Sequence, residues 1–255
     1  MSELFSNVSN ITWQQVLMWL IGAVLIYLAI KKDMEPSLLL PMGFGAILVN
    51  LPMSGAVTQI YDKVSEIGVL DTLFNAGIAN ELFPLLLFIG IGAMIDFGPL
   101  LSNPKMMLFG AAAQFGIFFT LGMAVLLGFE LKDAASIAII GAADGPTSIY
   151  VANYFKSNYQ GAIMVAAYSY MALVPIVQPP VIKLCTTQKE RRIRMPYNPK
   201  AVSQTTRILF PISVTVIAGT IAPKSAELIG FLMFGNLIRE CGVLGSLSET
   251  AQKDL

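Results

Sequence analysis

The sequence predicts an all-α polytopic membrane protein that contains a discontinuous helix. Of its 255 residues, 55% are hydrophobic and only 13% are charged, whereas a typical soluble domain has about 25% charged residues. Charges are absent from long windows that meet or approach the roughly 20 apolar residues of a transmembrane helix. These windows are residues 4–30, 36–61, 106–129, 157–182 and 208–223. The alternative, a soluble protein with buried core helices, leaves too few charges to cover its surface.

The first spans lie at the N-terminal end. We expect a helix over residues 13–30, because tryptophans favour the membrane interface and Lys31 and Lys32 indicate a cytoplasmic end. The second window, 37–60, contains two prolines and three glycines, so a kinked or interrupted span is expected there. Residues 61–81 are amphipathic and mostly acidic, which predicts an external connection.

Three further spans are expected in the middle of the chain. The segments 82–98 and 106–129 are apolar, and the second carries the small-residue cluster "GAAAQFG", which allows close helix packing. Residues 130–133, "ELKD", return the chain to the outer side. Residues 157–182 form another full span, with a proline near its far end.

The loop 183–207 carries seven basic residues against one glutamate, which places it in the cytoplasm by the positive-inside rule. It serves either as a docking face for cytoplasmic partners or only to set topology. The cytoplasmic lysines and this loop fall on one side if the segment 134–155 is re-entrant or is matched by another partial span. We therefore expect four regions. Residues 1–80 form N-terminal helices with an external connection, and residues 81–182 form a core transmembrane region. Residues 183–207 form the basic loop, and residues 208–255 form a C-terminal region with helices at 208–223 and 226–238.

The segment 134–155 contains "GAADGPTS", which regular helix cannot accommodate. Pro146 lacks an N–H and clashes with the carbonyl four residues earlier, and a glycine loosens the turn on each side. The sequence therefore predicts a half-helix over about 134–142, an extended turn, and a second half-helix from about 147. Irregular backbone at membrane depth occurs where it is buried in protein or lines a wet cavity.

This break predicts an ion site. The first half-helix ends in carbonyls with partial negative charge, so the carbonyls of Gly141 and Ala143 together with the Asp144 carboxylate suit a hard cation. The second half-helix starts near Thr147 and Ser148, whose N–H groups suit an anion. Because an aspartate at the bilayer centre costs about 2.5–3.5 kcal/mol, Asp144 is a functional candidate. The alternative is a protonated, hydrogen-bonded structural aspartate.

Other polar residues in apolar segments have two interpretations each. Tyr168 and Tyr170 either reach the same cavity or anchor their helix at the interface. Asn236 is either a ligand or a helix-packing amide. Arg239 ends an apolar run and is expected to pair with the glutamate after it. Asp96, in "MIDFGP", is expected to end a helix near the inner interface.

Several stretches carry a family resemblance: "GAADGPTSIY", "DFGPLLSNPK", "GAAAQFGIF", "AAYSYMALVPIVQPPVIKL" and "LMFGNLIRECGV". Together they resemble the β subunit of the biotin-dependent sodium-pumping decarboxylases of oxaloacetate, methylmalonyl-CoA, glutaconyl-CoA and malonate. The matches run from about residue 81 to the end, and the first eighty residues match more loosely. The resemblance implies an inverted-repeat transporter-like fold in a bacterial or archaeal cell membrane.

The resemblance also implies a mechanism. A carboxyltransferase subunit transfers CO2 to biotin on a carrier, and the β subunit decarboxylates the carboxybiotin and drives Na+ outward while a proton is consumed. A small membrane-anchor subunit belongs to the same complex. In the family pattern, the aspartate of "ADGPT" belongs to the sodium and proton pathway and the second tyrosine of "YSY" takes part, which implicates Asp144 and Tyr170.

Members of that family continue past the position of "LSETAQKDL" into further spans, whose second signature helps to complete the ion site. Residues 208–255 are therefore expected to be the start of a second repeat, which is incomplete in this chain. Two alternatives to the pump stay open. One is a secondary transporter that couples sodium or protons to a small anion without an enzymatic step, and the other is a structural anchor for soluble subunits.

Overall fold

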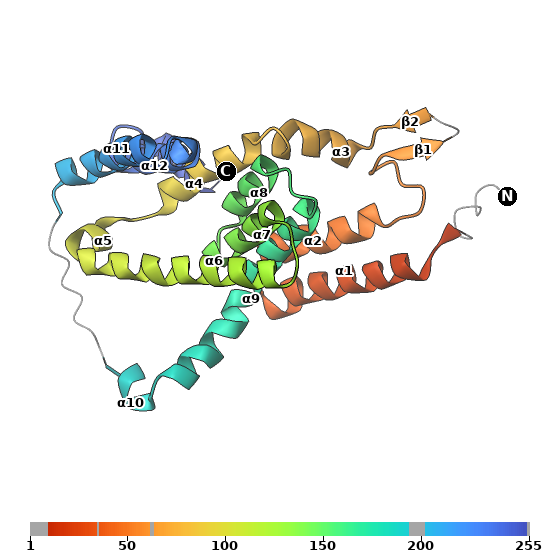
Figure 1. Ribbon diagram of the computed structural model, residues 1–255, viewed down its shortest axis with the longest axis horizontal. Helices are drawn as coiled ribbons and strands as arrows, with labels where there is room; N and C mark the ends of the chain where they lie inside the picture. The colour runs from red at the N-terminus through yellow and green to blue at the C-terminus, as the bar shows by residue number, and fades with distance from the viewer. Residues whose placement is uncertain (1–9, 35, 62–63, 194–201, 254–255) are drawn as a thin grey trace. The chain divides into compact units, whose positions relative to one another are not determined.

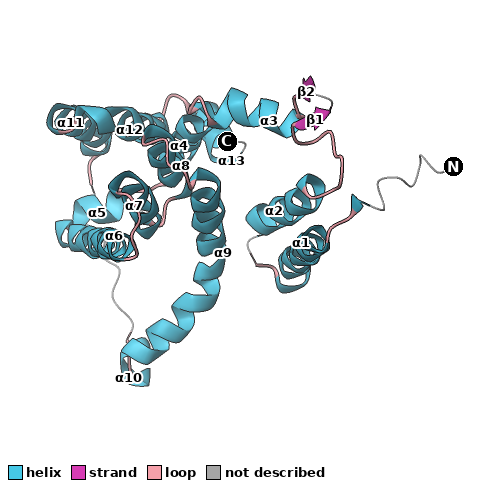
Figure 2. Ribbon diagram, turned by 45° about the vertical axis from the view of Figure 1, so that its right-hand side comes forward, coloured by secondary structure: helices cyan, strands magenta, loops and turns pink. Residues whose placement is uncertain are grey.

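The computed structural model describes residues 10–34, 36–61, 64–193 and 202–253. Most of these residues are helical, which confirms the all-α prediction (Figures 1 and 2). The chain forms two compact units. Unit 1 comprises Met1–Asn80 and Tyr168–Thr187, and unit 2 comprises Glu81–Ala167 and Gln188–Leu255.

Within the described residues, two helical segments are long and apolar enough to cross a membrane. They are α1 (Trp13–Lys32) and the segment Pro104–Leu126, which joins the 3₁₀ turn η4 (Pro104–Met107) to α6 (Leu108–Leu126). A third is added if the bent pair Val69–Ile78 and Leu82–Met94, which turns by 59°, is one broken span. These helices expose large apolar side chains, and Phe109 and Leu126 of α6 are 75% and 81% exposed. Such a surface suits lipid, so the prediction of a membrane protein is confirmed.

Unit 1 is built on a pair of close-packed helices. The side chains of Thr12 and Gln15 form a capping box at the start of α1. Helix α2 (Pro36–Val49) lies beside α1, as Figures 1 and 2 show. At their crossing, a Cβ added to Gly22 would lie 2.6 Å from the carbonyl oxygen of Gly43. The two backbones approach this closely only because neither residue has a side chain.

The second window is interrupted, as its prolines and glycines predict. Helix α2 has Pro41 inside it and ends at Val49, well before residue 60. Turns that include Pro52 and Gly55 follow, because these residues do not continue a helix. A two-stranded antiparallel hairpin, which the sequence did not predict, comes next. Its strands are β1 (Gln59–Tyr61) and β2 (Val64–Glu66).

The predicted external connection therefore contains more structure than an amphipathic loop. After the hairpin come α3 (Val69–Leu73) and the π-helical turn η3 (Phe74–Ile78). These two elements form the first half of the bent pair, and α4 (Leu82–Met94) in unit 2 forms the second half. The carboxylate of Asp71 accepts from the Thr58 N–H at 2.6 Å, which ties the start of α3 to the turn before the hairpin.

Unit 2 packs α4 against α12 (Ala226–Glu240), and α11 (Gln204–Ile221) lies along α12. A Cβ on Gly92 would lie 1.9 Å from the Leu232 carbonyl oxygen, and one on Gly235 would lie 2.0 Å from that of Ile89. The α4–α12 contact is therefore made by two backbones that touch through opposing glycines.

The remainder of unit 2 holds the discontinuous segment. Helix α6 lies beside α7 (Leu131–Ala138) and the 3₁₀ turn η5 (Ile139–Ala142), and α8 (Gly145–Tyr154) follows. The hydroxyl of Tyr150 donates to Glu227 at 3.0 Å, which links α8 to the first turn of α12. Helix α9 (Gln160–Cys185) starts in this unit, and its residues from Tyr168 onward belong to unit 1.

The basic loop is shorter than expected. Helix α9 takes up its first residues, and the short helix α10 (Gln188–Arg191) follows. Residues 194–201, which include Arg194 and Lys200, lie outside the described residues. Arg207 lies inside α11, which begins at Gln204 behind the N-cap Ser203. The expected start of this helix at 208 was therefore four residues late. The helices α5 (Gly98–Ser102) and α13 (Gly245–Lys253), which were not predicted, complete the unit.

Candidate functional site: an aspartate between two half-helices

The discontinuous helix breaks at Ala143 and Asp144. Ala143 has a left-handed backbone with φ of 56°, and Asp144 is extended. The predicted break is therefore confirmed, with one correction: α8 begins at Gly145 rather than near residue 147. Pro146 fits in this first turn because helix N-termini need no donor there, and its fixed φ suits the helix. The proline therefore starts the second half-helix instead of preceding it.

The two half-helices form a hairpin whose ends meet. Asp133, in the first turn of α7, accepts hydrogen bonds from the Ser157 hydroxyl at 2.7 Å and the Asn158 N–H at 3.1 Å, just after α8. The segment therefore enters and leaves at the same place, as a re-entrant helix does, with Ala143 and Asp144 at its tip. A hairpin of this kind is one of the two arrangements that would keep the predicted cytoplasmic lysines on one side.

The Asp144 carboxylate is half-buried and has a hydroxyl partner from its own helix. The Thr147 hydroxyl donates to it. The Asp144 carbonyl accepts from the N–H of Ser148 at 3.2 Å and from its hydroxyl at 2.9 Å. Within the described part of the chain, no basic side chain pairs with the carboxylate. Its oxygen lone pairs beyond the one used by Thr147 are thus available to a cation.

The other predicted residues of this segment differ in their surroundings. The side chain of Ser148 is fully buried, and its hydroxyl and backbone N–H both donate to the Asp144 carbonyl. Gly141 packs on α6, where a Cβ would lie 3.0 Å from the carbonyl carbon of Gly116. Ala143, at the tip, is exposed. Thr147, Asp144 and the carbonyl end of η5 therefore lie together, while the role of each in binding stays a prediction.

The two predicted tyrosines lie on α9 in unit 1, whereas Asp144 lies in unit 2. Tyr168 is half-buried and Tyr170 is 46% exposed. Ser169, between them, donates to the sulfur of Met42 at 3.7 Å, which ties α9 to α2. Tyr170 also lines a mostly apolar cavity of about 230 Å³ with Val174, Val177 and Gln178. This part of α9 thus contacts α2.

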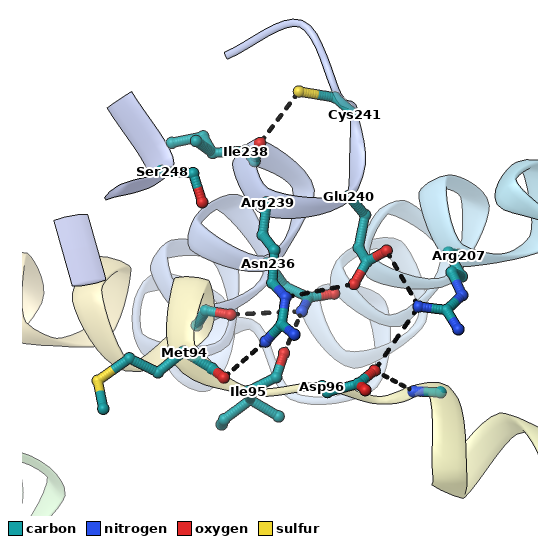
Figure 3. Close-up of polar contacts among 12 residues, drawn as sticks. Met94, Ile95, Asp96, Arg207, Asn236, Ile238, Arg239, Glu240, Cys241 and Ser248 are labelled. Carbon is teal, nitrogen blue, oxygen red and sulfur yellow. Dashed lines mark hydrogen bonds and ion pairs between the residues drawn. The ribbon is translucent and has the colours of Figure 1, made fainter. Parts of the chain in front are cut away.

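A second break follows α4, and side chains from α12 close it (Figure 3). The buried amide of Asn236 donates to the carbonyls of Gly92 at 3.3 Å and Ile95 at 2.9 Å. Arg239 donates to the Met94 carbonyl at 2.6 Å. The last carbonyls of a helix have no partners within the helix. Asn236 and Arg239 supply those partners for α4. The Asn236 amide is thus used in packing α12 against α4.

An ion-pair network surrounds Asp96 beside this break (Figure 3). Arg207 lies 3.7 Å from the Asp96 carboxylate and 3.6 Å from that of Glu240, and Arg239 lies 3.7 Å from Glu240. The expected Arg239–Glu240 pair is therefore present. Sequence reasoning missed Arg207, which it counted only as a cation of the basic loop. No local pattern marks this pair, because Arg207 and Asp96 lie more than a hundred positions apart in the sequence.

Comparisons with known proteins agree with the sequence resemblance. The methylmalonyl-CoA decarboxylase subunit beta of Veillonella parvula is 50% identical over 244 residues, which cover 96% of this chain and 62% of the relative. The glutaconyl-CoA decarboxylase subunit beta of Acidaminococcus fermentans is 49% identical, with 96% and 63% covered. The probable oxaloacetate decarboxylase beta chain of Vibrio cholerae is 41% identical, with 96% and 69% covered.

The chain thus spans less than two thirds of the length of the first two of these relatives. Residues 14–255 match the family described as the Na+-transporting oxaloacetate decarboxylase beta subunit. This match covers nearly the whole chain, and the break at Asp144 lies inside it. The chain therefore belongs to the family of Na+-transporting oxaloacetate decarboxylase beta subunits.

Proposed function

We propose that this chain belongs to the membrane subunit of a biotin-dependent decarboxylase, which decarboxylates carboxybiotin and couples that step to outward sodium transport with consumption of a proton. Membership of a sodium-transporting family supports the choice of ion. The observation that carries the proposal is the half-buried Asp144 carboxylate at the tip of a re-entrant hairpin, where no basic side chain of the described residues neutralises it.

Sodium is the transported ion in this proposal, and the tip supplies its ligands. Na+ is a hard cation that takes oxygen ligands, as Ca²⁺ and Mg²⁺ do. The Asp144 carboxylate and the Thr147 hydroxyl lie in contact at the tip. The carbonyls of Gly141 and Ala143, where the first half-helix ends, add partial negative charge. We assign these four groups to sodium and regard them as one part of a larger site.

Asp144 also links sodium to the proton. When carboxybiotin loses CO2, the bond between the ring nitrogen and the carboxyl carbon breaks, and the nitrogen takes up a proton. An aspartate that is protonated without sodium and ionised with sodium releases one proton for each ion bound. We propose that Asp144 is this acid and that Tyr170 belongs to the same proton path.

The biotin resides on partner subunits in this proposal. A carboxyltransferase and biotin-carrier subunit loads the biotin, a small subunit anchors the complex, and all of them meet at a bacterial or archaeal cell membrane. The names of the relatives, each a subunit or chain beta, support a multi-subunit complex. Of the two residues expected to bind an anion, we retain the Thr147 N–H, since the N–H and the hydroxyl of Ser148 both donate to the Asp144 carbonyl.

The test compares Asp144→Asn with Asp96→Asn in membranes that carry the whole complex. Sodium-stimulated decarboxylation of oxaloacetate, methylmalonyl-CoA and glutaconyl-CoA is measured with and without avidin, which blocks biotin. We expect Asp144→Asn to lower the sodium-stimulated rate about 100-fold or more, the usual scale for a lost proton-transfer group. Asp96→Asn should stay within a few-fold of wild type, because Asp96 is part of an ion-pair network.

Two results would contradict the proposal. If the Asp144→Asn variant keeps sodium-dependent, avidin-sensitive decarboxylation, Asp144 is not the acid of the mechanism. Sodium-driven uptake of a small anion by the wild type, insensitive to avidin and independent of any carboxyltransferase, would favour a secondary transporter.

A further inference from the structure

Three residues tie together the two ends of the re-entrant hairpin, and we call them the clasp: Asp133, Ser157 and Asn158. One oxygen of the Asp133 carboxylate accepts from the Ser157 hydroxyl at 2.7 Å and from the Asn158 N–H at 3.1 Å. The other oxygen accepts from the Asn158 side-chain amide at 3.3 Å. The hairpin has the clasp at one end and the break at Asp144 at the other.

The clasp holds a charge where charge is expensive. Asp133 is only 2% exposed, and a buried carboxylate is stable only when its oxygens are hydrogen-bonded. The Ser157 hydroxyl is the main cause of a pKa below the usual value of 3.8 for Asp133, while burial opposes it and the two Asn158 donors and Lys132 add to it. The carboxylate is therefore ionised at neutral pH, and its hydrogen bonds are of the stronger, charge-assisted kind.

The buried positions of α7 carry small side chains besides Asp133. They are Ala134, Ser136 and Ala138, whereas α8 buries both small and large side chains, among them Ala152 and Ile149. Small side chains let two helices approach closely but contribute little dispersion energy each. Since α7 buries no large side chain that could interlock with α8, the polar tie at one end contributes to setting the register of the two half-helices.

The turn after α8 depends on the same tie. Lys156 has a left-handed backbone with φ of 48°, which costs energy for any residue other than glycine. The Ser157 N–H donates to the Ala152 carbonyl at 3.0 Å, and its hydroxyl accepts from the Tyr159 N–H at 3.2 Å while donating to Asp133. A strained backbone of this kind persists only where surrounding hydrogen bonds hold it in place. The hydrogen bond from the Ser157 hydroxyl to Asp133 is one of them.

We propose that Asp133 is a positioning residue, which fixes the register of α7 against α8 and thereby the placing of the carbonyls near Gly141 against Asp144 and Thr147. This inference rests on the proposed sodium-binding role of the hairpin tip. A shift of one half-helix along the other moves the carbonyl end of η5 away from the carboxylate. Because oxygen ligands bind a hard cation only within a narrow range of distances, such a shift weakens sodium binding.

The experiment measures the sodium concentration that gives half-maximal effect. We expect Asp133→Ala to raise this concentration about tenfold and Ser157→Ala about threefold, which is the scale of the net contribution of a typical hydrogen bond. Ser157→Ala is the milder variant, which keeps the test usable if Asp133→Ala reaches the membrane poorly. Each is assayed twice: by sodium-stimulated decarboxylation in membranes with the whole complex, and by equilibrium binding of ²²Na⁺ to the purified protein in lipid nanodiscs.

Glu130→Gln is the matched control. Glu130 lies three residues before Asp133 and carries the same charge, but its side chain is 71% exposed and pairs with Lys132 rather than with the loop after α8. This variant should leave the half-saturating sodium concentration unchanged. A role that is structural alone predicts a different pattern, in which Asp133→Ala lowers the amount of folded protein and the maximal rate but leaves that concentration as in wild type. This outcome would overturn the inference.

The two assays also separate this inference from the proposed function. If the wild type binds ²²Na⁺ but shows no sodium-stimulated decarboxylation, the enzymatic proposal fails, and the shift in binding still tests the clasp. If the wild type decarboxylates with sodium and the Asp133 and Ser157 variants keep its sodium dependence, the clasp proposal fails alone.

Discussion

The two helix breaks of unit 2 share a local sequence and differ in what surrounds them. Each has an aspartate followed closely by glycine and proline, Asp96 before Gly98–Pro99 and Asp144 before Gly145–Pro146. At the first break, Arg207 lies beside Asp96, and side chains of α12 bond to the end of α4. At the second, Asp144 has the Thr147 hydroxyl of its own helix.

The difference shows how one motif supports two roles. Backbone carbonyls at membrane depth need partners. Neighbouring helices provide them after α4, so that break is closed and its aspartate belongs to an ion-pair network. At Asp144 the described residues leave a carboxylate with spare lone pairs, which suits an ion that comes and goes. We therefore interpret the first break as structural and the second as functional.

The largest expected effect on stability comes from the close contact between α4 and α12 beside the first break. Gly92→Ala places a Cβ 1.9 Å from the Leu232 carbonyl oxygen, so α4 and α12 must separate. We expect a loss of about 3 kcal/mol or more in the free energy of unfolding, since overpacking against rigid backbone is costly. The thermal unfolding of the purified protein measures it. Gly110→Ala on α6 is the control, because a Cβ there meets nothing within 4 Å. Equal midpoints for the two variants would refute the close packing.

A smaller loss of stability is expected when the Asn236 amide, which binds the carbonyls at the end of α4, is removed. Asn236→Ala leaves the Gly92 and Ile95 carbonyls without the Asn236 amide, and losing partners for buried polar groups costs about 1–3 kcal/mol. The unfolding midpoint falls accordingly. The comparison variant is Asn80→Ala, whose exposed side-chain amide donates to the Ala76 carbonyl four residues earlier. If Asn236→Ala is as stable as Asn80→Ala, the first break does not depend on α12.

The smallest effects separate the two aspartates. Asp96→Asn should lower the free energy of unfolding by up to about 1 kcal/mol, because partly exposed ion pairs contribute little. Asp144→Asn should leave stability unchanged or raise it, since it breaks no ion pair with a basic side chain of the described residues and the amide oxygen can still accept from the Thr147 hydroxyl. Thermal unfolding at neutral pH distinguishes them. A larger loss of stability for Asp144→Asn than for Asp96→Asn would reverse the assignment of the two breaks.

Much of the architecture follows from local chemistry that a reader of the sequence can apply. Long charge-free windows predict membrane helices because lipid replaces water as their solvent, and α1 and α6 confirm this. "GAADGP" predicts a break because proline cannot continue a helix, and the break lies at Ala143–Asp144. The resemblance to the decarboxylase β subunits also rests on short local stretches, and the family match agrees with it.

Contacts between distant segments could not be predicted in this way. Arg207 and Asp96 are more than a hundred positions apart, and so are Asn236 and Gly92. The hairpin β1–β2 and the early end of α2 depend on turn residues inside an apolar window, where hydropathy alone predicts a span. Hydropathy and helix propensity describe a residue and its neighbours along the chain, so they predict where helices run and where they stop. Which aspartate finds an arginine depends on which helices pack together, because a charge is balanced by what lies beside it in space.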